Sequence, residues 1–283
     1  MVAREIIAVK GTFSVAAPVA VLAALLVLAE PGSAAAGSAD DAAMPGARVV
    51  DMLPEYGIRQ RVLMFGPAKA DKAIVMLPGG SGKVGISRNG ALKHDKNFVV
   101  RTREAWSALG YLVIIPDALD HQNLRGLRST PQYAAVVAAL LALAKAQTSG
   151  PVFLLGTSQG SIAAMNGAAH SQPGVLAGVV LTESVAKLGG SGETVFDANP
   201  SEVRVPALVV ANEKDACAIA APTEAAAIVK ALSGSPHAEV AYVNGGTGRS
   251  SDPCSSLSPH GYYGIEQEVV DLIARWMSAQ GGR

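Results

Sequence analysis

One serine in this sequence stands in a setting that could make its hydroxyl group reactive. Ser158 is the central residue of Gly156-Thr157-Ser158-Gln159-Gly160, which lies between an apolar run and an alanine-rich segment. In a G-x-S-x-G pattern the serine sits on a tight, strained turn from strand to helix, and the two glycines leave room for the chain to fold back. The five-residue pattern is not specific by itself. The strand-like run before it and the helix-like run after it are the context that such a nucleophile elbow requires.

A base and an acid are needed to activate such a serine. Its hydroxyl is a poor nucleophile at neutral pH, so another group must take its proton and a third must orient that base. For a serine on this kind of turn, the acid comes next in the chain and the histidine last. Asp215 follows a strand-like run at residues 207–210, and His260 lies between the last expected strand and the last expected helix. We therefore predict that Ser158, Asp215 and His260 form a catalytic triad.

These three residues and their order resemble the α/β-hydrolase superfamily over nearly all of the chain that follows the N-terminal segment. The resemblance implies an α/β fold with a mostly parallel sheet of about eight strands, helices on both faces, and hydrolysis through an acyl-enzyme. The superfamily includes esterases, lipases, thioesterases and peptidases, so the resemblance alone does not identify the substrate.

Two backbone N–H groups are the usual means of stabilising the oxyanion that forms during acyl transfer. The resemblance assigns one of them to Gln159, directly after the serine. The second is expected in a glycine-rich loop after a buried strand, where we favour Gly80 and keep Ser81 as the alternative. This loop has Pro78-Gly79 where the superfamily often has His-Gly, so the donor is uncertain by one residue. The other reading of the loop is a plain flexible connection.

Other side chains could in principle take part in the chemistry. Glu183 follows the strand expected at residues 176–181 and could orient the histidine in place of Asp215, which we favour for its position in the turn. The remaining histidines are expected on surfaces or loops, and two other aspartates in turns or caps: His94, His121, His170, His237, Asp117 and Asp252. Zinc-binding spacings are absent from the sequence, so neither a metal nor a cofactor is expected.

Strand-like and helix-like segments alternate through most of the chain. The expected strands are 58–65, 73–77, 111–115, 151–155, 176–181, 207–210 and 238–243. The expected helices are 97–109, 130–147, 161–171, 223–232 and 264–277. This alternation predicts a mostly parallel sheet with helices on both faces, and a ligand site at the carboxyl ends of the strands.

Composition excludes several classes of function. The chain has 283 residues, 49% hydrophobic and 16% charged, which is enough to bury a full core. Lysine plus arginine equals aspartate plus glutamate at 23 each, so there is no overall field to attract nucleic acid. We therefore expect no nucleic-acid partner.

The N-terminus has the pattern of a secretory signal peptide. Arg4 and Lys10 precede an apolar run at residues 15–29, and small residues after it offer a cleavage site following Ala36. An uncleaved membrane anchor is the alternative, but the run is shorter than the roughly 20 residues needed to span a bilayer, and Pro18 interrupts it.

We accordingly divide the chain into a signal peptide at 1–36, a linker at 37–47 and a hydrolase-like domain at 48–283. The mature protein would be periplasmic or secreted, with no stable membrane anchor after cleavage.

The two cysteines fit an exported protein. In an oxidising compartment Cys217 and Cys254 should pair, and closing a loop of this length would stabilise the fold by about 4 kcal/mol in the chain-entropy model. Two separate buried thiols are the alternative. A disulfide would tie the loop of Asp215 to that of His260. A similar disulfide occurs in secreted polyester-cleaving and cutinase-like α/β-hydrolases, although this chain has Thr157 where those have a bulky residue before the serine.

The sequence thus predicts an exported serine esterase that acts on small-molecule or polymeric esters and functions as a monomer. An amide or peptide hydrolase with the same triad remains a second possibility. A catalytically silent relative that serves as a binding protein is a third.

Overall fold

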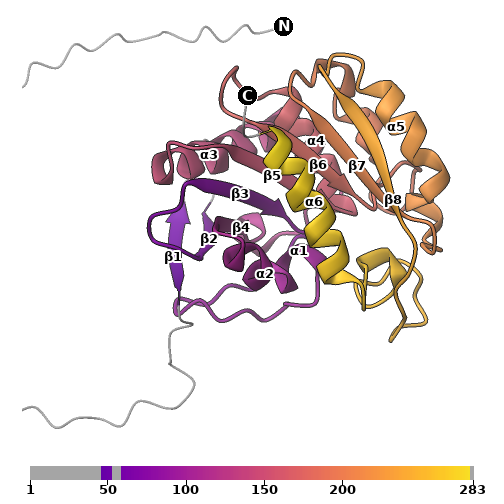
Figure 1. The fold of residues 1–283 in the computed structure, drawn as a ribbon. Coiled ribbons are helices and arrows are strands. Elements are labelled where there is room, and N and C mark those ends of the chain that lie inside the picture. Colours follow the sequence, from indigo (N-terminus) through magenta and orange to yellow (C-terminus); the bar gives the residue numbers. More distant parts are fainter. Residues whose placement is uncertain (1–45, 53–58, 281–283) are drawn as a thin grey trace, which may run out of the picture. The chain divides into compact units, whose positions relative to one another are not determined.

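An eight-stranded sheet forms the centre of the fold (Figure 1). The computed structural model describes residues 46–52 and 59–280, all within the unit Asp41–Arg283. The strands are β1 (Ala47–Met52), β2 (Gln60–Phe65), β3 (Lys72–Leu77), β4 (Tyr111–Pro116), β5 (Val152–Thr157), β6 (Gly178–Thr182), β7 (Ala207–Asn212) and β8 (Ala238–Val243). Their spatial order is β1-β2-β4-β3-β5-β6-β7-β8. Strand β2 is antiparallel to both of its neighbours and strands β3 to β8 run parallel, which confirms the predicted sheet.

Strand β1 is the one strand of the sheet that the sequence analysis did not assign. It pairs antiparallel with β2, from Ala47 opposite Phe65 to Met52 opposite Gln60. As an edge strand it is only partly buried, so its sequence lacks the apolar run that marks the inner strands. It begins at Ala47, the last residue of the expected linker. The expected signal peptide and the rest of the linker up to residue 45 lie outside the described residues.

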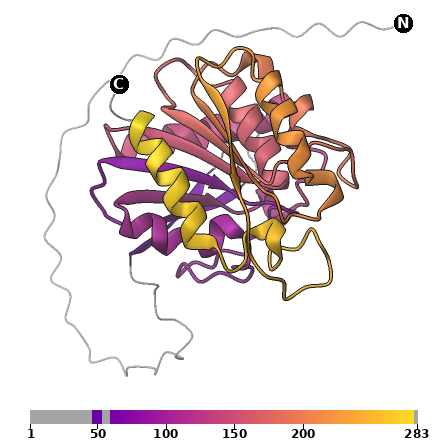
Figure 2. The same cartoon turned by 45° about the vertical axis from the view of Figure 1, so that its right-hand side comes forward.

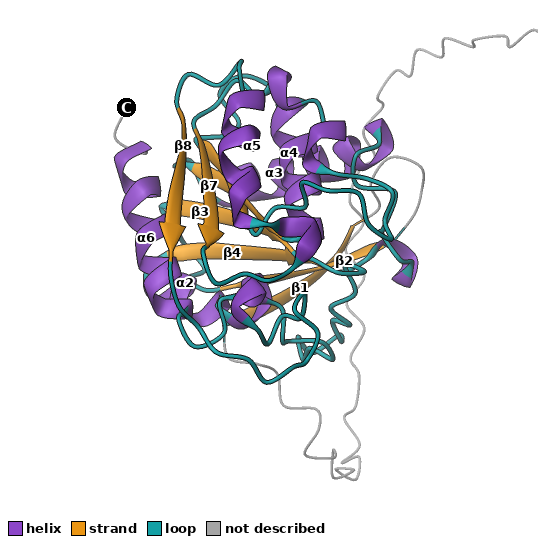
Figure 3. Ribbon diagram, turned by 90° about the vertical axis from the view of Figure 1, so that its right-hand side faces the viewer, coloured by secondary structure: helices purple, strands orange, loops and turns teal. Residues whose placement is uncertain are grey.

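Helices cover both faces of the sheet (Figure 3). One face packs against α3 (Pro131–Gln147), α4 (Gln159–Ala169) and α5 (Ala225–Ala231). The other packs against α1 (Phe98–Arg101), α2 (Arg103–Ala108) and α6 (Glu266–Gln280), and α6 runs across this face in Figure 2. Successive strand residues point to opposite faces, so Val75 belongs to the first apolar cluster and Ile74 to the second. The predicted layers are therefore confirmed.

Local hydrogen bonds decide where two of the helices begin. Thr130 caps α3 as expected, because its hydroxyl accepts a bond from the N–H of Tyr133 at 3.3 Å and Pro131 occupies the first turn. The single helix expected at 97–109 is instead divided at Thr102 into α1 and α2. The buried Thr102 hydroxyl donates to the Phe98 carbonyl at 2.8 Å, and side-chain bonds of this kind compete with a regular helix.

The carboxyl ends of the parallel strands meet at one edge of the sheet, so the loops after β3, β5, β6, β7 and β8 converge there. Short 3₁₀ turns interrupt the loops: Leu119–His121, Val195–Asp197, Pro200–Glu202, Ala218–Ala220, Pro222–Glu224 and Pro259–Gly261. None of the described helices combines the length and apolar character needed to cross a membrane.

The first turn of α4 packs directly on two strands because two glycines lack side chains. A Cβ atom on Gly160 would lie 2.1 Å from the carbonyl oxygen of Leu77 in β3. A Cβ atom on Gly156, near the end of β5, would lie 2.2 Å from the carbonyl oxygen of Gly160. Both distances are far below van der Waals contact with backbone atoms that cannot move independently. The two glycines of the motif are therefore required by the packing of α4 against the sheet.

The substitution Gly160→Ala should destabilise the fold by about 3 kcal/mol or more, because the added methyl group must displace the backbone of β3. Urea denaturation followed by circular dichroism would measure the loss. Gly190→Ala is a matched control, since a Cβ atom at Gly190 would meet nothing within 4 Å. Equal denaturation midpoints for the two variants would contradict this account of the packing.

Candidate active site

Ser158 occupies a strained position between β5 and α4. Its φ of 52° and ψ of −125° lie outside the regions that non-glycine residues favour, at a cost of about 1–3 kcal/mol. The surrounding backbone holds it there: the Ser158 N–H donates to the Thr182 carbonyl at 2.9 Å, and the Ser161 hydroxyl donates to the Ser158 carbonyl at 2.6 Å. This is the backbone geometry of the turn that the motif predicts.

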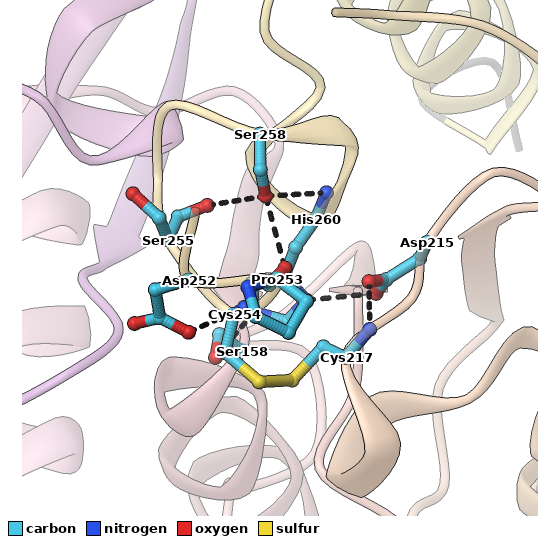
Figure 4. Close-up of a disulfide and its surroundings, with 9 residues drawn as sticks. All are labelled: Ser158, Asp215, Cys217, Asp252, Pro253, Cys254, Ser255, Ser258 and His260. Carbon is cyan, nitrogen blue, oxygen red and sulfur yellow. Dashed lines mark hydrogen bonds and ion pairs between the residues drawn. A yellow bond between two sulfur atoms is a disulfide. The ribbon is translucent and has the colours of Figure 1, made fainter. Parts of the chain in front are cut away.

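The structure brings the three residues of the predicted triad together. His260 Nε2 lies 2.9 Å from Ser158 Oγ, and His260 Nδ1 lies 2.7 Å from Asp215 Oδ2 (Figure 4). The side chains of His260 and Asp215 are 4% and 0% exposed. These residues come from the loops after β5, β7 and β8, far apart in sequence. The result is a continuous line of hydrogen-bonding atoms from a buried carboxylate to an accessible hydroxyl.

Asp215 is held by its own loop. Its second carboxylate oxygen, Oδ1, accepts a hydrogen bond from the N–H of Cys217 at 2.7 Å, and its backbone N–H donates to the Asn212 carbonyl at 2.8 Å. Since one oxygen is bound to the loop and the other faces His260, the carboxylate has a defined orientation. It can therefore select the tautomer of His260 in which Nδ1 carries the proton and Nε2 accepts one.

Asn212 joins the aspartate loop to the histidine loop, a role that the sequence analysis missed. Its Nδ2 donates to the carbonyls of Gly245 at 3.0 Å and Pro259 at 2.9 Å, while Oδ1 accepts from the Lys214 N–H at 3.1 Å. The side chain is fully buried. An asparagine at the end of an otherwise apolar strand was the available signal, because a buried amide needs several partners.

The histidine loop is anchored by two further hydroxyl groups. Ser258 Oγ accepts from the His260 N–H at 3.2 Å and lies 2.8 Å from the Ser255 carbonyl, to which it donates (Figure 4). The fully buried Tyr262, in the left-handed region at φ 56°, donates its hydroxyl to the Val210 carbonyl in β7 at 3.0 Å. The imidazole ring of His260 is therefore carried on backbone that is fixed on both sides.

Cys217 and Cys254 form a disulfide between the same two loops (Figure 4). The bridge closes a sequence separation of 37 residues, with a Cα–Cα distance of 4.7 Å. The alternative of two separate thiols is therefore wrong. Cys217 follows Asp215 by two residues and Cys254 precedes His260 by six, so the bond links Asp215 and His260 covalently through short stretches of chain.

Glu183 does not take the place of Asp215. Its Oε1 accepts a bond from the Asn212 N–H at 2.9 Å, and its Oε2 has no donor among the described residues. The residue is 1% exposed and has a φ of 43°. Burial raises the pKa of Glu183 well above its ordinary value, and the neighbouring Asp215 carboxylate raises that pKa further. Glu183 therefore keeps its proton to higher pH than an exposed glutamate does.

Glu183, Asp215 and His260 also place possible metal ligands within 4.8 Å of one another. The 2.7 Å contact between His260 Nδ1 and Asp215 Oδ2 fits a hydrogen bond. Two ligands of one tetrahedral zinc ion lie roughly 3.4 Å apart, given zinc–ligand bonds of about 2.1 Å. The donor set therefore favours a hydrogen-bonded triad over a metal centre.

The predicted oxyanion donors face the same cavity as Ser158. Gly80 and Gln159 both line it, whereas Ser81 lines an adjoining cavity. Neither the Gly80 nor the Gln159 backbone N–H donates to an acceptor within the part of the chain that the structure describes. Of Gly80 and Ser81, Gly80 is the residue that lines the Ser158 cavity, which favours it as the second donor. Asp117 steadies the loop beyond it by accepting from the N–H groups of Val84 at 2.8 Å and Ile86 at 2.9 Å.

The cavity beside Ser158 has a volume of about 300 Å³. Apolar walls come from Phe98 and Ile219, and charged side chains come from Arg125 and Asp252.

The remaining histidines lie elsewhere: His94 lines the adjoining cavity, His170 contacts the Asn166 carbonyl, His237 pairs with Glu239, and His121 belongs to a 3₁₀ turn. Asp252 accepts from the Cys254 N–H at 2.9 Å, as expected for a turn residue.

Comparison with known proteins matches this architecture to solved structures. No protein-family model and no curated protein sequence matches the chain. Among solved structures, Est1E from Butyrivibrio proteoclasticus is 15% identical with a TM-score of 0.58, over 84% of this chain and 100% of that one. The α/β hydrolase GrgF from Penicillium sp. sh18 is 11% identical with a TM-score of 0.57, over 84% and 99%. The chain has the α/β-hydrolase fold.

This α/β-hydrolase fold is also similar to an acylaminoacyl peptidase of Pyrococcus horikoshii, at 10% identity and a TM-score of 0.56. The match covers 83% of this chain but only 41% of the peptidase. At such identities the likeness concerns the fold alone.

The substitution Glu183→Gln should remove a pH-dependent loss of stability. The pKa of Glu183 in the folded protein lies above its ordinary value of 4.5. Below pH 4.5 the side chain is protonated in both the folded and the unfolded state, and its contribution to stability is fully present. This contribution is lost as the pH rises from 4.5 toward the raised pKa of the folded state. In that range the unfolded chain loses the proton while the folded protein still keeps it, which favours unfolding. The stability of the variant relative to wild type should therefore increase as the pH rises above about 4.5. Thermal unfolding at several pH values would measure it.

Glu268→Gln, at an exposed position on α6, is the matched control and should show no such trend. If Glu183→Gln were destabilised more at high pH than at low pH, then Glu183 would be ionised in the folded protein.

The double substitution Cys217→Ser/Cys254→Ser should lower the free energy of unfolding by about 4 kcal/mol in the chain-entropy model. Hydrolytic activity should fall as well, because the two loops that carry Asp215 and His260 lose their covalent link. Verified reduction of the wild-type protein should reproduce both losses. An unchanged melting temperature and unchanged activity after reduction would show that the disulfide does not hold the loops in register.

Proposed function

We propose that this protein is a serine hydrolase that cleaves carboxylic esters through an acyl-enzyme. The observation that carries the proposal is the contact of 2.9 Å between His260 Nε2 and Ser158 Oγ, continued by the contact of 2.7 Å between His260 Nδ1 and Asp215. These atoms meet the geometric requirement for a nucleophile, a base and an orienting acid. The catalytic roles are those predicted from the sequence.

In the first half of the reaction, Ser158 Oγ attacks the ester carbonyl carbon and its proton passes to His260 Nε2. Asp215 stabilises the imidazolium that forms. The backbone N–H groups of Gln159 and Gly80 donate to the oxyanion of the tetrahedral intermediate. The intermediate then expels the alcohol, which takes the proton from His260, and the acyl group remains on Ser158.

In the second half, a water molecule attacks the acyl-enzyme while His260 takes its proton. Collapse of the second intermediate releases the carboxylic acid, and the proton returns to Ser158. No redox step occurs in either half, and every proton that moves passes through His260. The chemistry of the proposal therefore balances with water as the only co-substrate and needs no cofactor.

An ester is the favoured substrate over an amide. The carboxylate that lines the Ser158 cavity outside the triad is that of Asp252, and it already accepts a bond from the Cys254 N–H. The lining thus holds one carboxylate outside the triad rather than a cluster of them that would bind an amine group. The esterase Pf2001 of Pyrococcus furiosus is similar in fold, at 13% identity and a TM-score of 0.56. The acylaminoacyl peptidase among the similar structures keeps amide hydrolysis as the second candidate.

A catalytically silent binding protein is disfavoured by the backbone of Ser158. A conformation that costs about 1–3 kcal/mol is expected where the strain serves a site.

The disulfide supports export to an oxidising compartment, as does the predicted signal peptide at 1–36, so the proposed location is periplasmic or secreted.

A fluorophosphonate probe should label the wild-type protein and not the Ser158→Ala variant. The same substitution should lower kcat for 4-nitrophenyl esters by at least about a thousandfold, because the nucleophile is lost. Ser171→Ala, two residues past the end of α4, is the matched control and should keep both labelling and activity. Absence of labelling in all three proteins would favour the silent relative. Faster hydrolysis of aminoacyl amides than of esters would favour the peptidase.

A further inference from the structure

Two cavities adjoin at the loop after β3. The cavity beside Ser158 shares Gly80, Asn97 and Ser256 with a neighbouring cavity of about 560 Å³. A substrate whose ester group reaches Ser158 can therefore extend past Gly80 into the larger space. The lining of that space decides which substituent is accepted there.

Three lysines line the larger cavity: Lys83, Lys93 and Lys96. None of the three is ion-paired with a carboxylate within the described part of the chain. All three are exposed, and the carboxylate on this wall is that of Asp95. Their ammonium groups are thus exposed positive charges around this cavity, without a carboxylate partner among the described residues.

Arg125 brings a further cation close to the reacting atoms. It lines the Ser158 cavity, and a Cβ atom on Gly80 would lie 3.9 Å from its Nη2, so the guanidinium stands beside the proposed oxyanion donor. Its backbone N–H donates to Asn123, but its guanidinium has neither a hydrogen-bond acceptor nor an ion pair among the described residues. A guanidinium in this state can bind a carboxylate in a bidentate manner.

The two linings together carry four such cationic side chains against two carboxylates outside the triad. The whole chain has equal numbers of acidic and basic residues, 23 of each, so the excess is local to the cavities. Charges of one sign around a concave site raise the local concentration of ligands of the opposite sign.

We propose that the site selects esters that carry an anionic group, such as a carboxylate, close to the scissile bond. Arg125 binds that group beside Gly80, and the lysines of the larger cavity attract it. This inference rests on the proposed function, since it names the substrate class of the same site. Arg125 acts here as a specificity-determining residue, and the chemical steps stay with Ser158 and His260.

Matched pairs of esters test the proposal on the purified full chain. On the acyl side, 4-nitrophenyl hemisuccinate is compared with neutral 4-nitrophenyl butyrate. On the alcohol side, the butyrate ester of 4-hydroxybenzoate is compared with that of 4-hydroxybenzamide. In at least one pair, kcat/KM should be higher for the anionic ester at low salt. The anionic-to-neutral ratio should fall about tenfold in Arg125→Gln, as expected for the loss of one charge-assisted contact.

The ratio should also fall as ionic strength increases, because salt screens exposed charges. Arg275→Gln removes an equal charge from an exposed position on α6 and should leave the ratio unchanged. Ratios that do not respond to Arg125→Gln in either pair would overturn the inference while ester hydrolysis itself stands. Failure to hydrolyse any ester or to react with fluorophosphonate would overturn the proposed function, and the inference with it.

Discussion

The close contact between the first turn of α4 and the ends of β3 and β5 is the constraint on which the site depends. A side chain at Gly156 or Gly160 would overlap backbone atoms, so the chain can only turn this tightly with glycine at both positions. Within this turn, Ser158 adopts a positive φ. Sheet packing thereby fixes the hydroxyl at the edge where the other loops converge, and it sets the N–H of Gln159 beside it.

The histidine and aspartate loops are long and irregular, and buried polar groups give them their shape. Asn212 satisfies carbonyls in the histidine loop, Ser258 satisfies the His260 N–H, and Tyr262 returns its hydroxyl to β7. An unpaired buried polar group would be costly, so these bonds leave the loops few alternative arrangements. The disulfide adds a covalent limit to the same pair of loops. The imidazole is thus positioned by a network of buried hydrogen bonds and one disulfide.

Charge is distributed unevenly around the triad. Two carboxyl groups lie near the imidazole of His260, and their surroundings differ. Asp215 accepts hydrogen bonds from two N–H groups, which favours its ionised form. Burial raises the pKa of Glu183 and favours its neutral form. A single buried negative charge then suffices to orient His260. Above the serine, Arg125 and the lysines of the adjoining cavity supply exposed positive charge. The negative charge is thus buried beside His260, whereas the positive charge is exposed around the cavities.

The sequence by itself determined the α/β architecture, because inner parallel strands are continuous apolar runs and amphipathic helices alternate with them. It also indicated Ser158, Asp215 and His260, whose residue types and order follow the strand ends of the fold. It did not indicate β1, since an edge strand is only half buried, or the break at Thr102, which depends on one hydroxyl bond. The contact of His260 with Asp215, the place of Gly80 at the Ser158 cavity, the hydrogen bonds of Asn212 and the position of Arg125 beside Gly80 depend on tertiary structure. Each of these features depends on which atoms of distant loops lie within a few ångströms of one another. Tertiary packing sets those distances, and no local sequence pattern encodes them.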